Sequence, residues 1–165
     1  MSQKNNQLEI IRHSTSHIMA YAVKEIFGDK VKFAIGPTIE DGFYYDFDLG
    51  PSRPGEAEAG EKTFAPEDLK KIEDKMKELI KKNLKFEKSE ASIKEALEKT
   101  KNQLYKQELI KDLEKNGEKK VTFYQVGEFE DLCRGPHVKS TKELGHFKLL
   151  SIAGAYWRGS EKNKM

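Results

Sequence analysis

The segment that most constrains the fold runs from His13 to Val23. It reads "HSTSHIMAYAV" and contains no charged residue, although Asp, Glu, Lys and Arg make up 35% of the chain. Apolar residues recur at helical spacing over residues 6–27, and Gly28 is typical of a position just after a helix. The helix has two non-polar faces, one with Ile18 and one with Tyr21. We therefore expect other elements to wrap around this helix rather than leave it on a surface.

The rest of the chain alternates strand-like and helix-like patterns. Residues 31–36 and 42–49 are rich in β-forming residues around the turn sequence "PTIEDG", which predicts a hairpin. The Gly-, Pro-, Glu- and Ala-rich stretch 50–63 is expected to be a flexible surface loop. An amphipathic surface helix is predicted over 66–83, and a short strand over 84–90.

Further strands and helices are predicted toward the C-terminus. Residues 92–116 read as helix, interrupted near 100–103 and closed by Gly117. Residues 119–133 and 147–159 are again rich in β-forming residues. We expect a single α+β domain over 1–165, with a mainly antiparallel sheet wrapped around the central buried N-terminal helix and additional amphipathic surface helices.

Composition narrows the class of protein. A net charge of +2 gives no general electrostatic argument for nucleic-acid binding. The lysine-rich part, residues 66–120, carries 16 Lys against 13 acidic residues, which is typical of solvated helices. The single cysteine, Cys133, allows no internal disulfide and fits a reducing compartment. The polar start lacks signal-peptide character and no apolar run reaches membrane-spanning length, so we expect a cytoplasmic protein without a membrane partner.

Two short motifs hold the residues best suited to chemistry. His13 and His17 are four residues apart on one helix face. Cys133 and His137 have the same spacing in the segment "CRGPH", which cannot be regular helix because of its Gly-Pro pair. Three imidazoles and one thiol match tetrahedral zinc in type and number. The alternative is a pair of core histidines. His146 stands alone and is expected to be structural.

The motifs "HSTSH", "AIGPTIEDGFYYDFDL", "LCRGPH" and "AGAYWRG" resemble, in order, the editing domain of bacterial-type threonyl-tRNA synthetase. The two paired motifs also resemble the editing domains of alanyl-tRNA synthetases. The resemblance implies a deacylase that hydrolyses Ser-tRNA(Thr) and binds the 3′ acceptor end of tRNA carrying serine. It implies no ATP-dependent chemistry in this chain, because the aminoacylation core, its partner in a full-length synthetase, is absent from residues 1–165.

Matching positions imply which residues form the editing site. Those expected to act catalytically are His13, His17, Lys106, Asp131, Cys133 and His137. Those expected to bind substrate are Tyr44, Tyr45, Gly36 and Arg134. Lys106 has a second interpretation as a solvated surface lysine. Either Tyr44 or Tyr45 suits the binding role, and strand packing is the other explanation for Tyr45. Trp157 and the lysine-rich helix around 99–111 are further candidate tRNA contacts, although a core role suits Trp157 better.

The resemblance also bears on whether the site needs a metal ion. The threonyl type is expected to edit with bound water and no required cofactor, whereas zinc would be held by His13, His17, Cys133 and His137. Three alternatives therefore stay open: a zinc-dependent deacylase of alanyl-type specificity, a non-catalytic module that docks the tRNA acceptor arm, and a structural domain stapled by metal.

Overall fold

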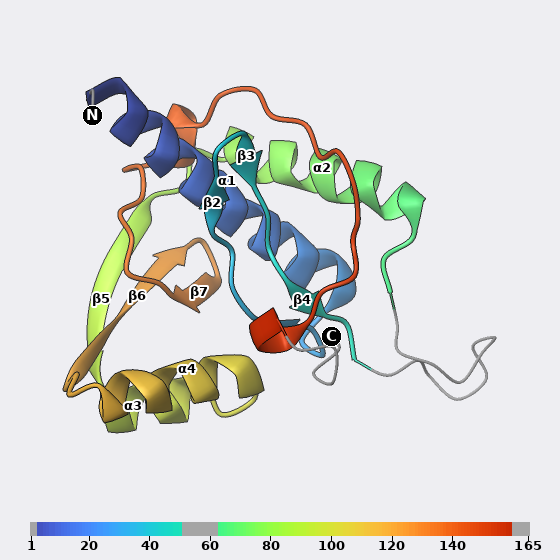
Figure 1. Cartoon of the computed structure of the whole chain (residues 1–165). Coiled ribbons are helices and arrows are strands. Elements are labelled where there is room, and N and C mark those ends of the chain that lie inside the picture. The colour runs from blue at the N-terminus through green and yellow to red at the C-terminus, as the bar shows by residue number, and fades with distance from the viewer. Residues whose placement is uncertain (1–2, 51–62, 160–165) are drawn as a thin grey trace.

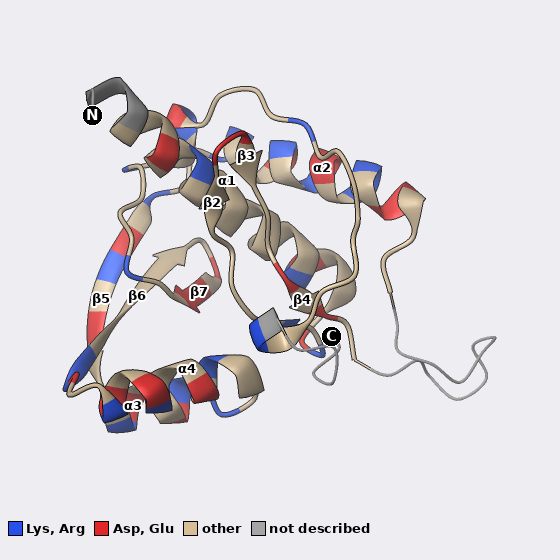
Figure 2. Cartoon of the chain, viewed as in Figure 1, with Lys and Arg blue, Asp and Glu red and all other residues tan. Residues whose placement is uncertain are grey.

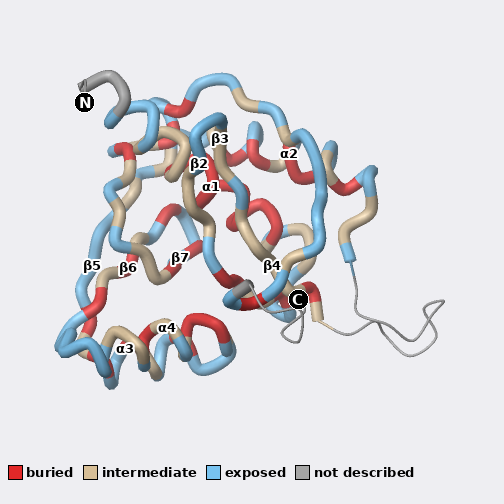
Figure 3. The backbone as a smooth tube through the Cα atoms, viewed as in Figure 1, coloured by how far each residue is buried: buried red, intermediate tan, exposed pale blue. Residues whose placement is uncertain are grey.

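Helix α1 (Gln3–Phe27) crosses the middle of the molecule, and the other elements surround it (Figure 1). The computed structural model describes residues 3–50 and 63–159, so almost all of the loop predicted at 50–63 lies outside the described residues. Every residue from Ser14 to Val23 is buried, and this part of α1 carries no charge (Figures 2 and 3). The helix ends before Gly28, whose φ of +82° suits glycine. The predicted central buried helix is confirmed.

The strands form three small antiparallel sheets instead of one larger sheet. β1 (Lys32–Phe33) pairs with β4 (Phe47–Asp48), and β2 (Thr38–Ile39) pairs with β3 (Gly42–Phe43). The third sheet has the order β5–β6–β7, built from β5 (Phe86–Ser92), β6 (Lys120–Val126) and β7 (Phe129–Leu132). The hairpin, the short strand and the strands within 119–133 were all predicted from sequence. The α+β class with antiparallel pairing is confirmed.

The β-rich reading of residues 147–159 is wrong as a prediction of strands. Residues 147–155 form neither helix nor strand, and a 3₁₀ turn follows at Trp157–Gly159. The segment passes along α2 as an extended chain (Figure 1). Its apolar side chains vary from the buried Trp157 to Leu150, which is 84% exposed. Without a neighbouring strand edge to pair with, β-forming residues do not make a strand.

Three further α-helices lie within residues 63–159. α2 (Pro66–Lys81) begins with proline at its first position, and Asp68 accepts a hydrogen bond from the Ala65 N–H at 2.8 Å. α2 packs against α1 through a shared core that includes Ile18, Val23, Met76 and Leu79.

Two shorter helices, α3 (Ile93–Lys99) and α4 (Leu104–Lys115), cover one end of the three-stranded sheet. Their separation at residues 100–103 confirms the predicted interruption. No helix in the described part of the chain combines the length and apolar character needed to cross a membrane.

Glu73 ties the extended C-terminal segment to α2. Its buried carboxylate accepts hydrogen bonds from Lys77 Nζ at 2.7 Å, Lys148 Nζ at 3.3 Å and the Leu149 N–H at 3.1 Å. The hydrogen bond from Lys77 is the largest cause lowering the pKa of Glu73 to about 2, and the Leu149 and Lys148 contacts add to it. Because the folded-state pKa lies below the unfolded-state value, this interaction stabilises the fold above pH 4.5 and is lost as the pH falls toward 2.

We expect Glu73→Gln to reduce the free energy of unfolding at pH 7 by about 1–3 kcal/mol, because hydrogen bonds to a buried charge are lost. The difference from wild type should shrink between pH 4.5 and pH 3. Urea denaturation measures both effects. Glu78→Gln is the matched control, since Glu78 is exposed on the same helix. Equal losses for the two variants would contradict the assignment.

Candidate functional site

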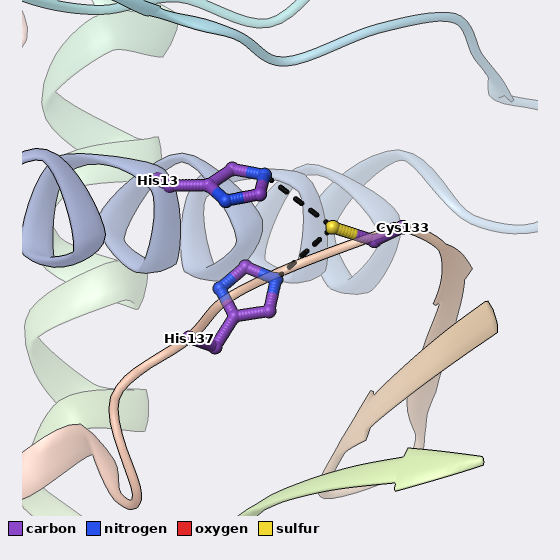
Figure 4. Close-up of side chains that lie close together, drawn as sticks. All are labelled: His13, Cys133 and His137. Atoms are coloured by element: carbon purple, nitrogen blue, oxygen red, sulfur yellow. Dashed lines mark hydrogen bonds between the residues drawn. The ribbon is translucent and has the colours of Figure 1, made fainter.

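The two histidine-containing motifs meet at α1. His13 projects from α1, and the loop after β7 passes beside it carrying Cys133 and His137 (Figure 4). The Cys133 Sγ lies 3.3 Å from His13 Nε2 and 3.3 Å from His137 Nε2. Segments more than a hundred residues apart in sequence therefore supply one cluster, which we call the His–Cys–His cluster: His13, Cys133 and His137.

The loop that carries Cys133 and His137 is fixed by backbone hydrogen bonds. The Cys133 N–H donates to the Thr122 carbonyl at 3.0 Å, which continues the register of β6 and β7. Gly135 has a φ of +71°, and its N–H donates to Cys133 Sγ at 3.3 Å. A Cβ at Gly135 would lie 2.5 Å from the Tyr124 hydroxyl oxygen. Glycine is therefore required both for the backbone conformation and for the space available.

Neighbouring rings pack against the three histidines, so that His17 is buried and His13 and His137 are half-buried. The rings of His13 and His137 are stacked, with their centroids 4.4 Å apart. The Phe86 ring also stacks on His137, with a centroid distance of 5.0 Å. His17 packs edge-on against Phe129 at 5.0 Å. Burial favours the uncharged forms of all these groups.

The pKa values follow from this burial. Desolvation lowers the pKa of His17 to about 3 and that of His137 to about 2, and it also lowers the pKa of His13. Desolvation also raises the pKa of the Cys133 thiol to about 11. At neutral pH the three imidazoles are therefore neutral and the thiol keeps its proton. Neutral imidazoles can accept protons, whereas a protonated thiol is a poor nucleophile.

The donor atoms suit a metal ion in kind. One ring nitrogen from each of His13 and His137 and the Cys133 Sγ all lie within 4.8 Å of one another. Nitrogen and sulfur donors of this kind fit zinc, with a fourth position left for water. His17 does not join this group of donor atoms in the described part of the chain. Of the four metal ligands expected from the two motifs, only His13, Cys133 and His137 have donor atoms close enough together to share one ion.

A second group of interacting side chains lies near the cluster. We call it the charged triad: the ion pair of Lys106 and Asp131, together with the Tyr45 hydroxyl. Lys106 Nζ is 3.0 Å from Asp131 Oδ1 and 3.2 Å from the Tyr45 hydroxyl, and that hydroxyl donates to Asp131 Oδ2 at 2.5 Å. Lys106 is 4% exposed, so it is not a solvated surface lysine. Burial, followed by the Asp131 charge, raises the pKa of Tyr45 well above its usual value.

A cavity of about 290 Å³ connects the cluster with the triad. Its walls combine polar groups of both sets with small and apolar residues: His13, Ser16, His17, Ile35, Gly36, Pro37, Tyr45, Lys106, Leu109, Asp131, Leu132 and Cys133. Within the described residues, His17 Nε2 is buried and has no hydrogen-bond partner. A larger, open hollow of about 920 Å³ lies over α3 and α4, but none of the predicted site residues lines it.

Gly36 lies against the cavity for a steric reason. A Cβ at this position would overlap the Tyr45 ring and would lie 2.6 Å from Ser16 Oγ. The Ser16 hydroxyl lies within hydrogen-bonding distance of two carbonyl oxygens, Gly36 at 3.2 Å and Tyr44 at 3.0 Å. These contacts hold the residues before β2 and after β3 against α1, and so fix one wall of the cavity.

Some predicted residues lie elsewhere. The Tyr44 side chain is 41% exposed and only Tyr45 joins the triad, while Arg134 is exposed on the loop. His146 is also exposed and does not line the cavity described above. Trp157 is buried against Tyr105 and donates to Glu108 at 2.8 Å, which fits its core interpretation.

Sequence reasoning missed Ser14 and Ser16, which are fully or almost fully buried beside the site. Both lie between the paired histidines of "HSTSH". Hydroxyl residues in the middle of a helix predicted to be buried were the available signal, since such groups need partners inside the protein.

The chain is similar to known proteins over most of its length. Residues 121–165 match the family described as "Threonyl and Alanyl tRNA synthetase second additional domain". Over 158 residues the chain is 53% identical to the threonine–tRNA ligase of Thermotoga maritima, and over 159 residues it is 51% identical to that of Carboxydothermus hydrogenoformans. Each match covers 95% of this chain and 23% of the relative.

A third relative, the threonine–tRNA ligase of Citrifermentans bemidjiense, is 52% identical over 160 residues, which is 96% of this chain and 23% of the relative. The chain thus spans about a quarter of the length of these relatives. These matches confirm the resemblance of the chain to the second additional, or editing, domain of bacterial threonyl-tRNA synthetases.

Proposed function

We propose that this chain hydrolyses the aminoacyl ester of Ser-tRNA(Thr), as the editing deacylase of a threonine–tRNA ligase. The observation that carries the proposal is a cavity with the neutral imidazole of His13 on one wall and the Lys106–Asp131 ion pair on another. The similarity to these synthetase domains supports editing as the general role. The proposal includes a cytoplasmic location, the tRNA acceptor end as partner, and the aminoacylation core as partner in a full-length synthetase.

The chemistry of the two amino acids explains the need for such a site. Serine lacks one methyl group of threonine, and a methyl group provides only about 1–3 kcal/mol of discrimination in a binding pocket. A second, hydrolytic site that admits serine and excludes threonine supplies the remaining selectivity. In our proposal the wall formed by Ser16, His17 and Gly36 leaves no room for the threonine β-methyl.

Hydrolysis requires a group that takes a proton from the attacking water and then gives a proton to the leaving ribose oxygen. The oxygen of a water molecule bonds to the ester carbonyl carbon while His13 Nε2 takes a proton from that water. The carbon–oxygen bond to the ribose then breaks, and the ribose oxygen leaves with the proton held by His13. The neutral state of His13, maintained by burial, suits it to the first step.

We assign to the charged triad the binding of the substrate's carbonyl oxygen and α-ammonium group. Lys106 carries three N–H groups, and its neighbours Asp131 and Tyr45 occupy two of them. We assign to the third a hydrogen bond to the oxygen that becomes negative during attack. Asp131 faces the same cavity and provides a counter-charge for the substrate's α-ammonium group. We assign to His17 Nε2, which is buried and unpaired among the described residues, a hydrogen bond from the substrate.

We propose that the reaction needs no metal, because His13 and Lys106 already provide the proton acceptor and the oxyanion donor. If a zinc ion were bound, His13, Cys133 and His137 would hold it, and it would lower the pKa of a bound water. Cys133 has no covalent role in this proposal, since its thiol is protonated at neutral pH and an ester needs no thioester intermediate.

The first test is deacylation of Ser-tRNA(Thr) and Thr-tRNA(Thr) by this chain. We expect faster release of serine, and we expect His13→Ala to reduce that rate by about 10²–10⁴-fold through loss of the general base. His146→Ala is the matched control, because His146 is an exposed histidine outside the cavity. Tight tRNA binding without cleavage of either ester would instead support a docking module.

The second test concerns the metal. We expect metal-depleted protein to keep its deacylation rate, and Cys133→Ala to keep most of it, because neither a metal nor a thiolate takes part in the proposed reaction. Metal analysis, followed by assays with and without chelator, measures this. Loss of activity on chelation and its return with zinc would contradict the metal-free proposal and favour the alanyl-type mechanism.

A further inference from the structure

Ser14 makes three polar contacts although its side chain is fully buried. Its Oγ lies 2.8 Å from the Ile10 carbonyl oxygen, 3.0 Å from the Val138 backbone nitrogen and 2.9 Å from His137 Nδ1. Ser14 thus joins the first turns of α1 to the loop that carries His137. No role was expected for it from the motifs.

Counting hydrogens assigns a direction to each contact. The Ile10 carbonyl can only accept, so it receives the single hydroxyl hydrogen of Ser14. The Val138 N–H can only donate, so it uses one lone pair of the Ser14 oxygen. The remaining contact requires His137 Nδ1 to be the donor. His137 is therefore protonated on Nδ1, and its Nε2 lone pair faces Cys133 Sγ.

His13 is fixed in the same way by a different partner. Its Nδ1 lies 3.3 Å from the Pro136 carbonyl oxygen, which can only accept, so the proton is on Nδ1. The Nε2 lone pair of His13 then also faces Cys133 Sγ. Two ring acceptors share one thiol hydrogen, so one of them lacks a donor in every arrangement of the cluster.

The position of the cavity indicates which of the two Nε2 atoms lacks a hydrogen-bond donor from the protein. His13 and Cys133 line it, whereas His137 does not. His137 packs among Phe86, Tyr124 and His17. The thiol hydrogen is therefore best used on His137 Nε2, where water has less access, and His13 Nε2 is left to accept a hydrogen bond from a water in the cavity.

We propose that Ser14 is a positioning residue that fixes the tautomer of His137, directs the Cys133 thiol hydrogen toward His137, and so leaves His13 Nε2 open to the attacking water. The tautomer assignment stands on contacts within the chain. Only the last step, the use of His13 on a water, rests on the proposed deacylation.

The experiment measures ring tautomers by long-range ¹H–¹⁵N NMR at neutral pH, without tRNA. In the wild-type protein we expect His13 and His137 to carry the proton on Nδ1. In Ser14→Ala we expect His137 to lose this preference, and we expect kcat for Ser-tRNA(Thr) to fall by up to about 10²-fold with little change in KM. Ser14→Thr, which keeps the hydroxyl, should restore the tautomer.

Thr15→Val is the matched control. Thr15 is the next residue, is also buried, and donates to the Ile11 carbonyl at 2.7 Å, but it has no histidine contact. It should lose a comparable helix hydrogen bond and keep the His137 tautomer and kcat. Equal effects of Ser14→Ala and Thr15→Val on the tautomer would overturn the proposal.

The wild-type spectrum is decisive even if Ser14→Ala does not fold. A proton on His137 Nε2 would overturn the positioning role. Nδ1-protonated rings in a protein that cleaves neither ester would support the role of Ser14 and overturn the proposed deacylation instead.

Discussion

The burial of α1 is the constraint on which the rest of the structure depends. Every residue from Ser14 to Val23 is buried, so each hydroxyl group on this stretch requires a partner inside the protein. Thr15 meets that requirement within the helix, whereas Ser14 also bonds to the loop after β7, and Ser16 bonds to the residues flanking β2 and β3. The same polar contacts that make burial of the helix possible also position the segments that form the cavity.

The site combines two electrostatic environments across one small cavity. The His–Cys–His cluster is enclosed by aromatic rings, which favours neutral imidazoles and a protonated thiol. The triad keeps a full ion pair between Lys106 and Asp131 in a buried position, supported by the Tyr45 hydroxyl. Neutral acceptors thus face fixed charges. This arrangement fits the proposed ester hydrolysis, in which the attacking water loses a proton and the carbonyl oxygen of the substrate becomes negative.

Several parts of this description followed from sequence patterns. The uncharged run in "HSTSHIMAYAV" predicted a buried helix, and Gly28 and Gly117 marked the ends of helices correctly. The hairpin around "PTIEDG" and the interruption near 100–103 also agree with the structure. Local rules sufficed here because a helix end or a tight turn is decided by neighbouring residues. The same rules failed at 147–155, where strand formation depends on an available edge elsewhere in the fold.

The sequence by itself determined that two histidines share one helix face and that Cys133 and His137 stand four apart, because those relations are fixed by local spacing. Tertiary structure alone decided that Lys106 is buried beside Asp131, that Tyr45 rather than Tyr44 faces the cavity, and that His17 stays apart from the three clustered donors. Tertiary structure also decided that Ser14 contacts His137. These properties depend on contacts between segments distant in sequence, whose distances and burial only the folded chain defines.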